Sequence, residues 1–323
     1  MPDNFISNLA ESPRLAGRVG FGCVGLTAMQ NKRDALRLLE HTYELGIRHF
    51  DTARAYGMGK SEEVLGEFAR TRRESITITT KFGISPPPYV SSVPFLSEIK
   101  RALKKLPFLD RQVRRTVGSG GSMGNFNSKA AKQSLEASLK ALKTDYIDFW
   151  LLHEATIEMT KNIELLEFLE SRKAAGQIRH IGIGSAYNKI LGNERALPEA
   201  LEVLQFENNI LTPTVDSFQN FRQCFIFSHS ALLPAKAAVN AITADQDCVS
   251  LFREKHGLDL SNLKVVTKLM FAWALETNSS GCVLFGSTSP DHIDENMSVF
   301  SDERISKELI ADFQHAVAAV LRC

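Results

Sequence analysis

The chain has 323 residues, of which 44% are hydrophobic and 23% are charged, proportions typical of a water-soluble globular protein. Its net charge of +1 at pH 7 gives no electrostatic reason to expect a nucleic acid or an anionic membrane as partner. No stretch approaches the roughly 20 continuous apolar residues of a membrane-spanning helix, and the polar first residues lack the apolar centre of a signal peptide.

The five cysteines are scattered, odd in number and without CxxC spacing. This pattern argues against a disulfide framework and against a structural zinc site, so we expect no metal centre. Free thiols fit a reducing compartment, and the sequence therefore predicts a cytoplasmic protein.

The first half of the chain alternates short apolar runs with longer amphipathic segments. The apolar runs predict strands and the segments with spacing near 3.6 predict helices. Strands are expected at 18–26, 48–53, 75–83, 146–153 and 178–185. Helices are expected at 32–46, 61–70, 128–143 and 162–176, with Ser128 as the N-cap of the third.

The second half continues the alternation less regularly, and a C-terminal helix over 303–323 closes it. Strands are expected at 203–209, 225–232 and 281–288, and helices at 244–257, 261–278 and 289–300. Repeated strand–helix units indicate a parallel sheet. About eight units fit, which favours a closed barrel over an open doubly wound sheet. We predict an α/β fold, a single (β/α)8 TIM barrel domain spanning residues 1–323.

The connection over residues 84–127, after the third strand, is too long for an ordinary barrel turn. Loops of this length are usually functional, and we expect this one near the active site. It contains a helical pattern over 95–109, a glycine-serine stretch that could act as a lid, and a basic cluster. The cluster fits a solvated helix face, or alternatively a collar for an anionic substrate. Its members are Lys100, Arg101, Lys104, Lys105, Arg111, Arg114 and Arg115.

Polar side chains stand at the carboxyl ends of three predicted strands. Asp51 lies near the end of the second, Lys81 lies near the end of the third and His153 ends the fourth, and Tyr56 follows shortly after the second. Parallel barrels place their functional groups at this edge. We therefore expect the four side chains to converge on one pocket.

These four side chains have complementary acid–base chemistry. The pKa of a phenol is near 10, and a cation such as Lys81 would lower it, while Asp51 would keep that lysine charged. His153 can orient a substrate oxygen. Such a set suits protonation of a carbonyl oxygen while a hydride reaches its carbon. Each residue alone also has a structural explanation, for example a pair between Asp51 and Arg54, so the joint occurrence favours a shared site.

Five segments resemble the motifs of the aldo-keto reductases, in the same order and over roughly residues 18 to 300. They are "DTARAYGMGKSEEVLG", "TTKFG", "TDYIDFWLLH", "GQIRHIGIGS" and "VLFGSTSPDHIDEN". The resemblance implies a barrel that binds an extended nicotinamide cofactor at its carboxyl end without a Rossmann domain. By motif position, Asp51, Tyr56, Lys81 and His153 match the family's catalytic tetrad, with Tyr56 as general acid.

The resemblance also implies contacts to the nicotinamide. Ser185 and Gln205 match positions that hold its carboxamide, although the family usually has Ser-Asn where this chain has Ser185-Ala186, with Asn188 further on. His229 stands where the family commonly stacks a tyrosine on the nicotinamide ring.

At the other end of the cofactor, the resemblance implies contacts after the eighth strand. Gly286, Ser287 and Thr288 match the phosphate-binding segment, and Glu295 and Asn296 match adenine contacts. Many NADP-binding members carry Lys and Arg where this chain has Gly286 and His292. Because NADP(H) is the usual cofactor of the family, the resemblance favours NADP(H), with NAD(H) as the second choice.

The sequence thus predicts an NAD(P)H-dependent oxidoreductase that reduces aldehydes or ketones to alcohols, or runs in reverse. Its partner would be a small-molecule carbonyl or alcohol; substrate identity and oligomeric state are not encoded in any pattern that we find. Two alternatives stay open. One is a nicotinamide-binding regulatory or interaction protein with little turnover. The other is a barrel isomerase or hydrolase with unrelated acid–base chemistry.

Overall fold

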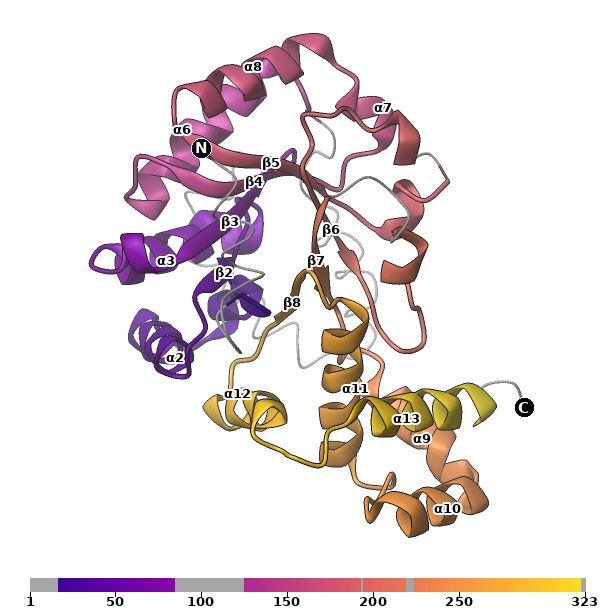
Figure 1. The fold of residues 1–323 in the computed structure, drawn as a ribbon. Coiled ribbons are helices and arrows are strands. Elements are labelled where there is room, and N and C mark those ends of the chain that lie inside the picture. Colours follow the sequence, from indigo (N-terminus) through magenta and orange to yellow (C-terminus); the bar gives the residue numbers. More distant parts are fainter. Residues whose placement is uncertain (1–16, 85–124, 193, 219–223, 321–323) are drawn as a thin grey trace, which may run out of the picture.

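Eight parallel strands form a closed barrel, in which neighbours in the sequence are neighbours in space. The computed structural model describes residues 17–84, 125–192, 194–218 and 224–320. Figure 1 shows the strands at the centre and the helices around them. The predicted (β/α)8 fold class is confirmed.

The strands are short, from three to seven residues, and all pair in parallel. The barrel closes between the first and last of them, where Val19 pairs with Val283. In chain order they are β1 (Val19–Gly22), β2 (His49–Asp51), β3 (Thr77–Phe82), β4 (Ile147–His153), β5 (Ile178–Gly184), β6 (Val203–Glu207), β7 (Phe225–His229) and β8 (Cys282–Phe285).

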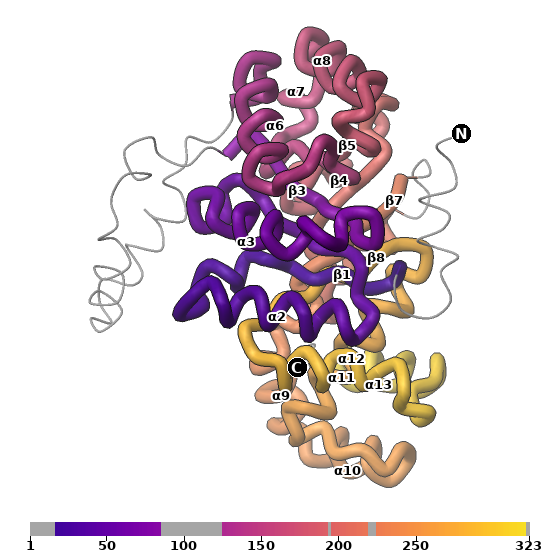
Figure 2. Tube along the Cα trace, turned by 90° about the vertical axis from the view of Figure 1, so that its left-hand side faces the viewer, coloured from indigo at the N-terminus to yellow at the C-terminus, as the bar shows by residue number. Residues whose placement is uncertain are grey.

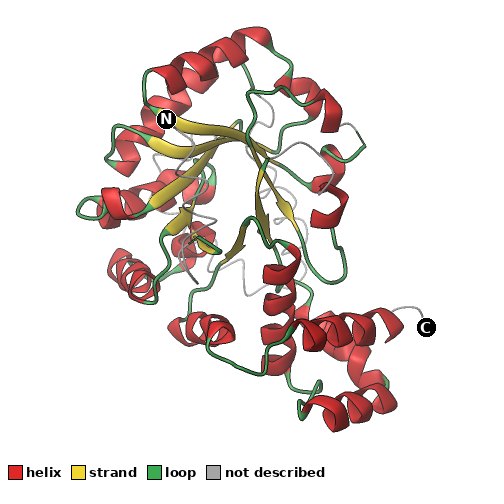
Figure 3. Cartoon of the chain, in the orientation of Figure 1, coloured by secondary structure: helices red, strands yellow, loops and turns green. Residues whose placement is uncertain are grey.

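Helices cover the outside of the barrel (Figure 3). They are α2 (Lys32–Glu44), α3 (Lys60–Ala69), α6 (Ser128–Leu142), α7 (Ile157–Thr160), α8 (Ile163–Ala174), α9 (Ala235–Ala244), α10 (Gln246–His256), α11 (Leu263–Thr277), α12 (Pro290–Met297) and α13 (Lys307–Val320). Figure 2 shows α2, α3 and α6 following one another along one side. On the opposite part of the ring, α9, α10, α11 and α13 gather together (Figure 1).

Several predicted boundaries are wrong, each for a local reason. The strand expected over 18–26 ends at Gly22, because a 3-10 helix (Cys23–Ala28) follows. The cap of α6 is Asn127, whose side chain accepts a hydrogen bond from Ala130 N, and Ser128 is already helical. The C-terminal helix begins at Lys307 rather than 303, after a turn in which Ile305 N donates to Asp302 O.

Two of the described α-helices, α7 and α9, were not predicted; α7 has only four residues, and the longer one is α9. Its sequence AKAAVNAITA is rich in alanine, so the buried stripe of Ala235, Ala238 and Ile242 gives a weak hydrophobic pattern. No side chain caps its first turn, which removes the usual start signal.

The predicted long loop over 84–127 falls almost wholly outside the described residues. The structure describes only 84 and 125–127 of it. The helical pattern over 95–109, the basic cluster and the glycine-serine stretch therefore remain predictions.

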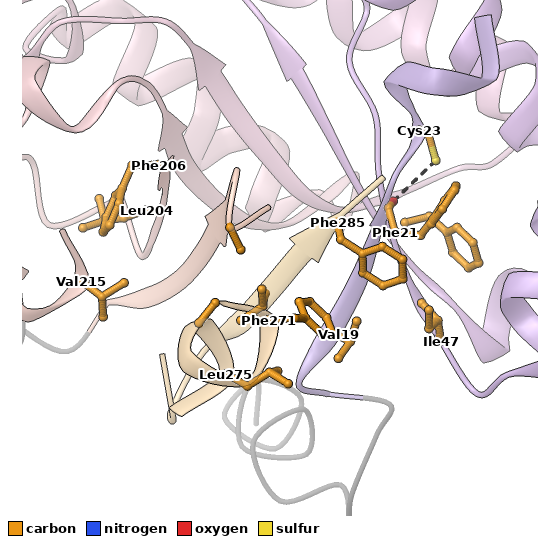
Figure 4. Close-up of a cluster of buried hydrophobic side chains, with 14 of the residues drawn as sticks. Val19, Phe21, Cys23, Ile47, Leu204, Phe206, Val215, Phe271, Leu275 and Phe285 are labelled. Carbon is orange, nitrogen blue, oxygen red and sulfur yellow. Dashed lines mark hydrogen bonds between the residues drawn. The ribbon is translucent and has the colours of Figure 1, made fainter. Parts of the chain in front are cut away.

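The apolar core has an outer and an inner part. Between barrel and helices, Phe285 of β8 packs edge-on against Phe21 and Phe271 (Figure 4). Inside the barrel, His49 stacks on Phe227 with ring centroids 4.4 Å apart and meets Phe149 edge-on. The interior is thus filled with side chains rather than hollow, which leaves only the strand ends for a ligand.

Two smaller features complete the fold. The four cysteines within the described ranges carry free thiols. Among the helices that the structure describes, none combines the length and the apolar character needed to cross a bilayer.

Candidate active site

The four predicted acid–base side chains meet at one end of the barrel. Asp51 is the last residue of β2, Lys81 lies near the end of β3 and His153 ends β4. Tyr56 opens a short 3-10 helix, η2 (Tyr56–Gly59), just beyond β2. All four line a cavity of about 820 Å³, so the expected convergence is found.

Lys81 and Asp51 form a buried ion pair. Lys81 Nζ lies 2.7 Å and 2.8 Å from the two carboxylate oxygens, and the side chains of both residues are less than a tenth exposed. Lys81 Nζ also donates to Thr52 O at 2.9 Å and lies 3.5 Å from Tyr56 OH. Burial disfavours the ammonium, but the charge of Asp51 and the contact with Tyr56 outweigh it, and the pKa of Lys81 rises. Lys81 therefore stays charged.

Tyr56 keeps its proton at neutral pH. Burial raises the pKa of its phenol, and nearby Lys81 offsets only part of this rise. The expected lowering of the pKa by the lysine is thus outweighed in the structure. The phenol is a neutral donor whose conjugate base would lie beside an ammonium.

His153 packs against Tyr56. The two rings meet edge to face, with centroids 5.9 Å apart and planes at 83°. Burial, assisted by the positive charge of Lys81, lowers the pKa of His153 to about 3. The imidazole is therefore neutral, with one donor and one acceptor nitrogen. Its Nδ1 is buried and has no hydrogen-bond partner in the described part of the chain.

The segment that carries Tyr56 is anchored from behind by Glu62 of α3. Arg54 Nη1 donates to Glu62 Oε2 at 3.0 Å, so Arg54 pairs with this carboxylate and not with Asp51. The fully buried Glu62 also accepts from Thr80 and Ser138, at 2.7 Å and 2.6 Å. Glu62 thereby ties the loop to β3 and α6.

The residues expected at the nicotinamide end all line the cavity. Ser185 Oγ donates to Ala155 O at 2.7 Å, and Gln205 Nε2 donates to Asp51 Oδ2 at 2.7 Å. His229 lies 2.8 Å from Ser230 Oγ through Nδ1, and burial lowers its pKa. Asn188 is exposed and is not among the lining residues.

The cavity extends to the N-terminus of α12. Gly286, Ser287, Thr288 and His292 line this end, whereas Glu295 and Asn296 do not. Glu295 instead pairs with Lys264, and Asn296 is buried. A helix N-terminus favours phosphate, which carries negative charge.

A nicotinamide dinucleotide fits the residues present. Cofactor sites typically measure about 300 to 1,000 Å³, and this cavity falls in that range. A Cβ atom at Gly286 would lie 2.9 Å from Gly22 O, so only glycine keeps the backbone this close to β1. The cavity therefore joins an acid–base end to an anion-favouring end.

Sequence reasoning missed several lining residues. Val24 and Gly25 follow β1, Glu154 follows β4, and Leu232 and Leu233 follow β7. The predicted strands 18–26 and 225–232 extended past the observed ends at Gly22 and His229, so Val24, Gly25 and Leu232 were assigned to strands and not to the loops that line the cavity. Val24 and Leu233 are exposed, at 56% and 82%, and give the mouth of the cavity an apolar rim.

The described part of the site contains no cluster of metal-binding side chains. Among the described residues, no three or more His, Cys, Asp or Glu side chains are grouped as metal ligands. The charged groups around Tyr56 instead form ion pairs, Lys81 with Asp51 and Arg54 with Glu62.

Comparison with known proteins identifies the family. The sequence profile of the Aldo/keto reductase family matches residues 18–212, more than half of the chain. The chain belongs to the aldo/keto reductase family. A curated relative, the uncharacterized oxidoreductase YqkF of Bacillus subtilis, is 35% identical over 168 residues. That match covers 52% of this chain and 44% of the relative, so the chain spans less than half of the relative's length.

Solved aldo-keto reductase structures share the fold. The holo form of an aldo-keto reductase from Bacillus halodurans is 21% identical, covers 94% of each chain and has a TM-score of 0.67. An aldo/keto reductase from Klebsiella pneumoniae, in complex with NADP and acetate, is 17% identical, with 93% and 91% coverage and a TM-score of 0.62. At these identities the likeness concerns the barrel itself.

Proposed function

We propose that this aldo/keto reductase is an NAD(P)H-dependent oxidoreductase that reduces an aldehyde or ketone to an alcohol, or catalyses the reverse reaction. One observation carries the proposal. The Lys81 ammonium contacts both Asp51 and the Tyr56 hydroxyl, beside a neutral His153, in the cavity at the carboxyl end of the barrel.

Tyr56 is the proton donor in this proposal. A bound nicotinamide supplies the hydride that reaches the carbonyl carbon. Tyr56 gives its hydroxyl proton to the carbonyl oxygen, and the resulting tyrosinate is stabilised by the Lys81 ammonium, 3.5 Å away. The tyrosinate then regains a proton from solvent. In the oxidative direction Tyr56 accepts the proton of the alcohol.

His153 and Asp51 support this transfer. The neutral imidazole can donate a hydrogen bond to the substrate oxygen without competing with Tyr56 as an acid, because its pKa of about 3 keeps it uncharged. Asp51 keeps Lys81 protonated, so the positive charge is present before the tyrosinate forms.

The cofactor would lie along the cavity. We assign Ser185, Gln205 and His229 to the nicotinamide, and Gly286, Ser287, Thr288 and His292 to the phosphates, because all of them line the same cavity. We keep Glu295 and Asn296 as adenine contacts in the proposal, although neither lines the cavity. NADP(H) is the first choice, supported by the NADP-bound Klebsiella pneumoniae structure. NAD(H) is the second, because Lys81 is the one Lys or Arg among the described lining residues.

The proposal is tested by incubating the purified protein with NADPH or NADH and a panel of small aldehydes, ketones and sugars. We expect substrate-dependent loss of absorbance of the reduced cofactor. Absence of turnover with every pair over a broad pH range would contradict the oxidoreductase. Tight cofactor binding without turnover would then favour the regulatory alternative.

Replacing the proposed donor gives a sharper test. Tyr56→Phe removes the hydroxyl and keeps the ring that packs on His153. We expect kcat to fall by about 100- to 10,000-fold, the usual contribution of a general acid, while the Kd of the cofactor changes little. Tyr43→Phe is the control, since Tyr43 lies on α2 and bonds Ser75 away from the cavity. Equal kcat for Tyr56→Phe and the control would rule out this role.

A further inference from the structure

We propose that Gln205 is a positioning residue of the acid–base site: its side-chain amide holds Asp51 and, through Asp51, orients Lys81 toward Tyr56. The resemblance to the family implied only a contact between Gln205 and the nicotinamide carboxamide. This inference rests on the proposed function and adds a second role for the same side chain.

The contact between Gln205 and Asp51 joins distant parts of the chain and of the barrel. The residues are 154 positions apart, one on β6 and one on β2, which lie across the ring of eight strands from each other. Gln205 Nε2 lies 2.7 Å from Asp51 Oδ2, and the residues are only 4% and 5% exposed. A carboxylate accepts hydrogen bonds only, so the amide must present its nitrogen to Asp51.

The side chain of Gln205 reaches Asp51 because β5 leaves room for it. Gly184 pairs with Gln205 in the ladder and has no side chain. A Cβ atom at Gly184 would lie 3.0 Å from Gln205 Oε1 and 3.6 Å from Lys81 Cδ. The Gln205 oxygen therefore faces β5, and it is the part of the amide left to accept a hydrogen bond from a carboxamide.

Two donors define the orientation of the Asp51 carboxylate. Its Oδ2 accepts from Gln205 at 2.7 Å and from Lys81 at 2.8 Å, and its Oδ1 accepts from Lys81 at 2.7 Å. The distance from Lys81 Nζ to Tyr56 OH is 3.5 Å, which makes this the longest of the hydrogen bonds of Lys81 described here. A carboxylate freed from Gln205 can rotate and draw Lys81 along, which would weaken that contact first.

Gln205→Met tests the inference because methionine keeps the length of the side chain and lacks the donor. Without the amide donor, the negative charge of Asp51 is less well compensated. Because this charge raises the pKa of Tyr56, the pKa of Tyr56 should rise further. We expect kcat to fall about tenfold or more and the pH profile of alcohol oxidation to move up by about one unit. The Kd of NADPH, measured by isothermal titration calorimetry, should also rise, because methionine lacks the oxygen that would accept from the carboxamide; the pH profile is therefore the readout of positioning. Gln205→Glu, which sets a second carboxylate against Asp51, should move the profile further.

The opposite pattern would overturn the inference. If Gln205 serves only the carboxamide, the variant raises the Kd of the cofactor and leaves the pH profile in place. Asn208→Leu is the control for general damage, since Asn208 is a buried amide just beyond β6 that bonds Thr214 and not Asp51. This control should lower stability without moving the profile. A profile that moves equally in the control also contradicts a specific role.

Two further measurements keep the test decisive. If Gln205→Met does not fold, Gly184→Ala replaces it. The added methyl group presses on Gln205 Oε1 without changing the amide and should move the pH profile upward; an unchanged profile counts against the inference.

If the wild type reduces no carbonyl, the proposed function fails by itself. Tyrosinate absorbance, taken as the difference between each protein and its Tyr56→Phe variant, then reads the ionisation of Tyr56. An upward shift in Gln205→Met supports the positioning role, and an identical midpoint refutes it.

Discussion

Lys81 keeps its charge inside the barrel because Asp51 supplies an opposite charge at 2.7 Å and Thr52 O a further acceptor. Such a pair gains little net stability, since both ions lose their hydration. In the proposed mechanism its value is local, because the ammonium is already in position when negative charge develops on Tyr56. The proposed function therefore explains the ion pair better than a contribution to folding does.

Removing one member of the pair should nevertheless be costly. In Asp51→Asn the Lys81 side chain, 2% exposed, stays buried without its counter-ion. We expect the free energy of unfolding to fall by about 3 kcal/mol or more near pH 7, measured by urea denaturation. Lys161→Ala, which breaks a surface pair with Glu158, should show no measurable loss. Equal stability of wild type and Asp51→Asn would show that Lys81 is not charged in this site.

Helix α3 positions the loop of Tyr56 by packing closely on α6. Gly66 of α3 faces the backbone of α6, where a Cβ atom would lie 2.7 Å from Leu142 Cα. The close approach also brings Glu62 of α3 within reach of Ser138 of α6. The helix pair and the anchor of Arg54 thus depend on the same contact.

Gly66→Ala should destabilise the protein although alanine is the better helix former. The clash is with backbone, so α3 and α6 must separate, at a cost of about 1 to 3 kcal/mol or more. Over most of this range the cost exceeds the roughly 1 kcal/mol that alanine gains over glycine in a helix. Thermal denaturation would measure the change. Ser171→Ala, at an exposed site on α8, should be neutral or slightly stabilising, and a similar result for Gly66→Ala would disprove tight packing here.

The barrel as a whole contains a neutral histidine that makes it sensitive to acid. His49 lies between Phe149 and Phe227 and bonds Thr77 and Thr79. Burial lowers the pKa of His49 from 6.5 to about 4. Between these values the unfolded chain binds the proton and the folded chain does not, so stability is lost as the pH falls.

We expect His49 alone to reduce the free energy of unfolding by about 2 kcal/mol between about pH 7 and pH 5. His49→Gln, which cannot titrate, should lose correspondingly less over this interval. Urea denaturation at both pH values measures the difference. His315→Gln, at an exposed site on α13, should keep the wild-type dependence. An unchanged dependence in His49→Gln would mean that the folded barrel binds this proton as readily as the unfolded chain.

The sequence by itself determined the fold class and the ends of the strands that carry the site. Apolar runs and amphipathic segments are local patterns, and a closed parallel barrel directs the carboxyl ends of its strands to one edge. The meeting of Asp51, Lys81 and His153 follows from this rule. The helical pattern failed for α9, whose alanines give little contrast, and the predictions for residues 85–124 lie outside the described residues.

Only the tertiary structure decided how these groups act on one another. Sequence patterns could not show that Gln205 reaches across the barrel to Asp51, nor that Arg54 turns to Glu62. The sequence suggested a lowered pKa for Tyr56, whereas burial raises it beyond what Lys81 offsets. Hydrogen-bond partners and burial depend on the distances between segments far apart in the chain, and such distances exist only once the barrel has closed.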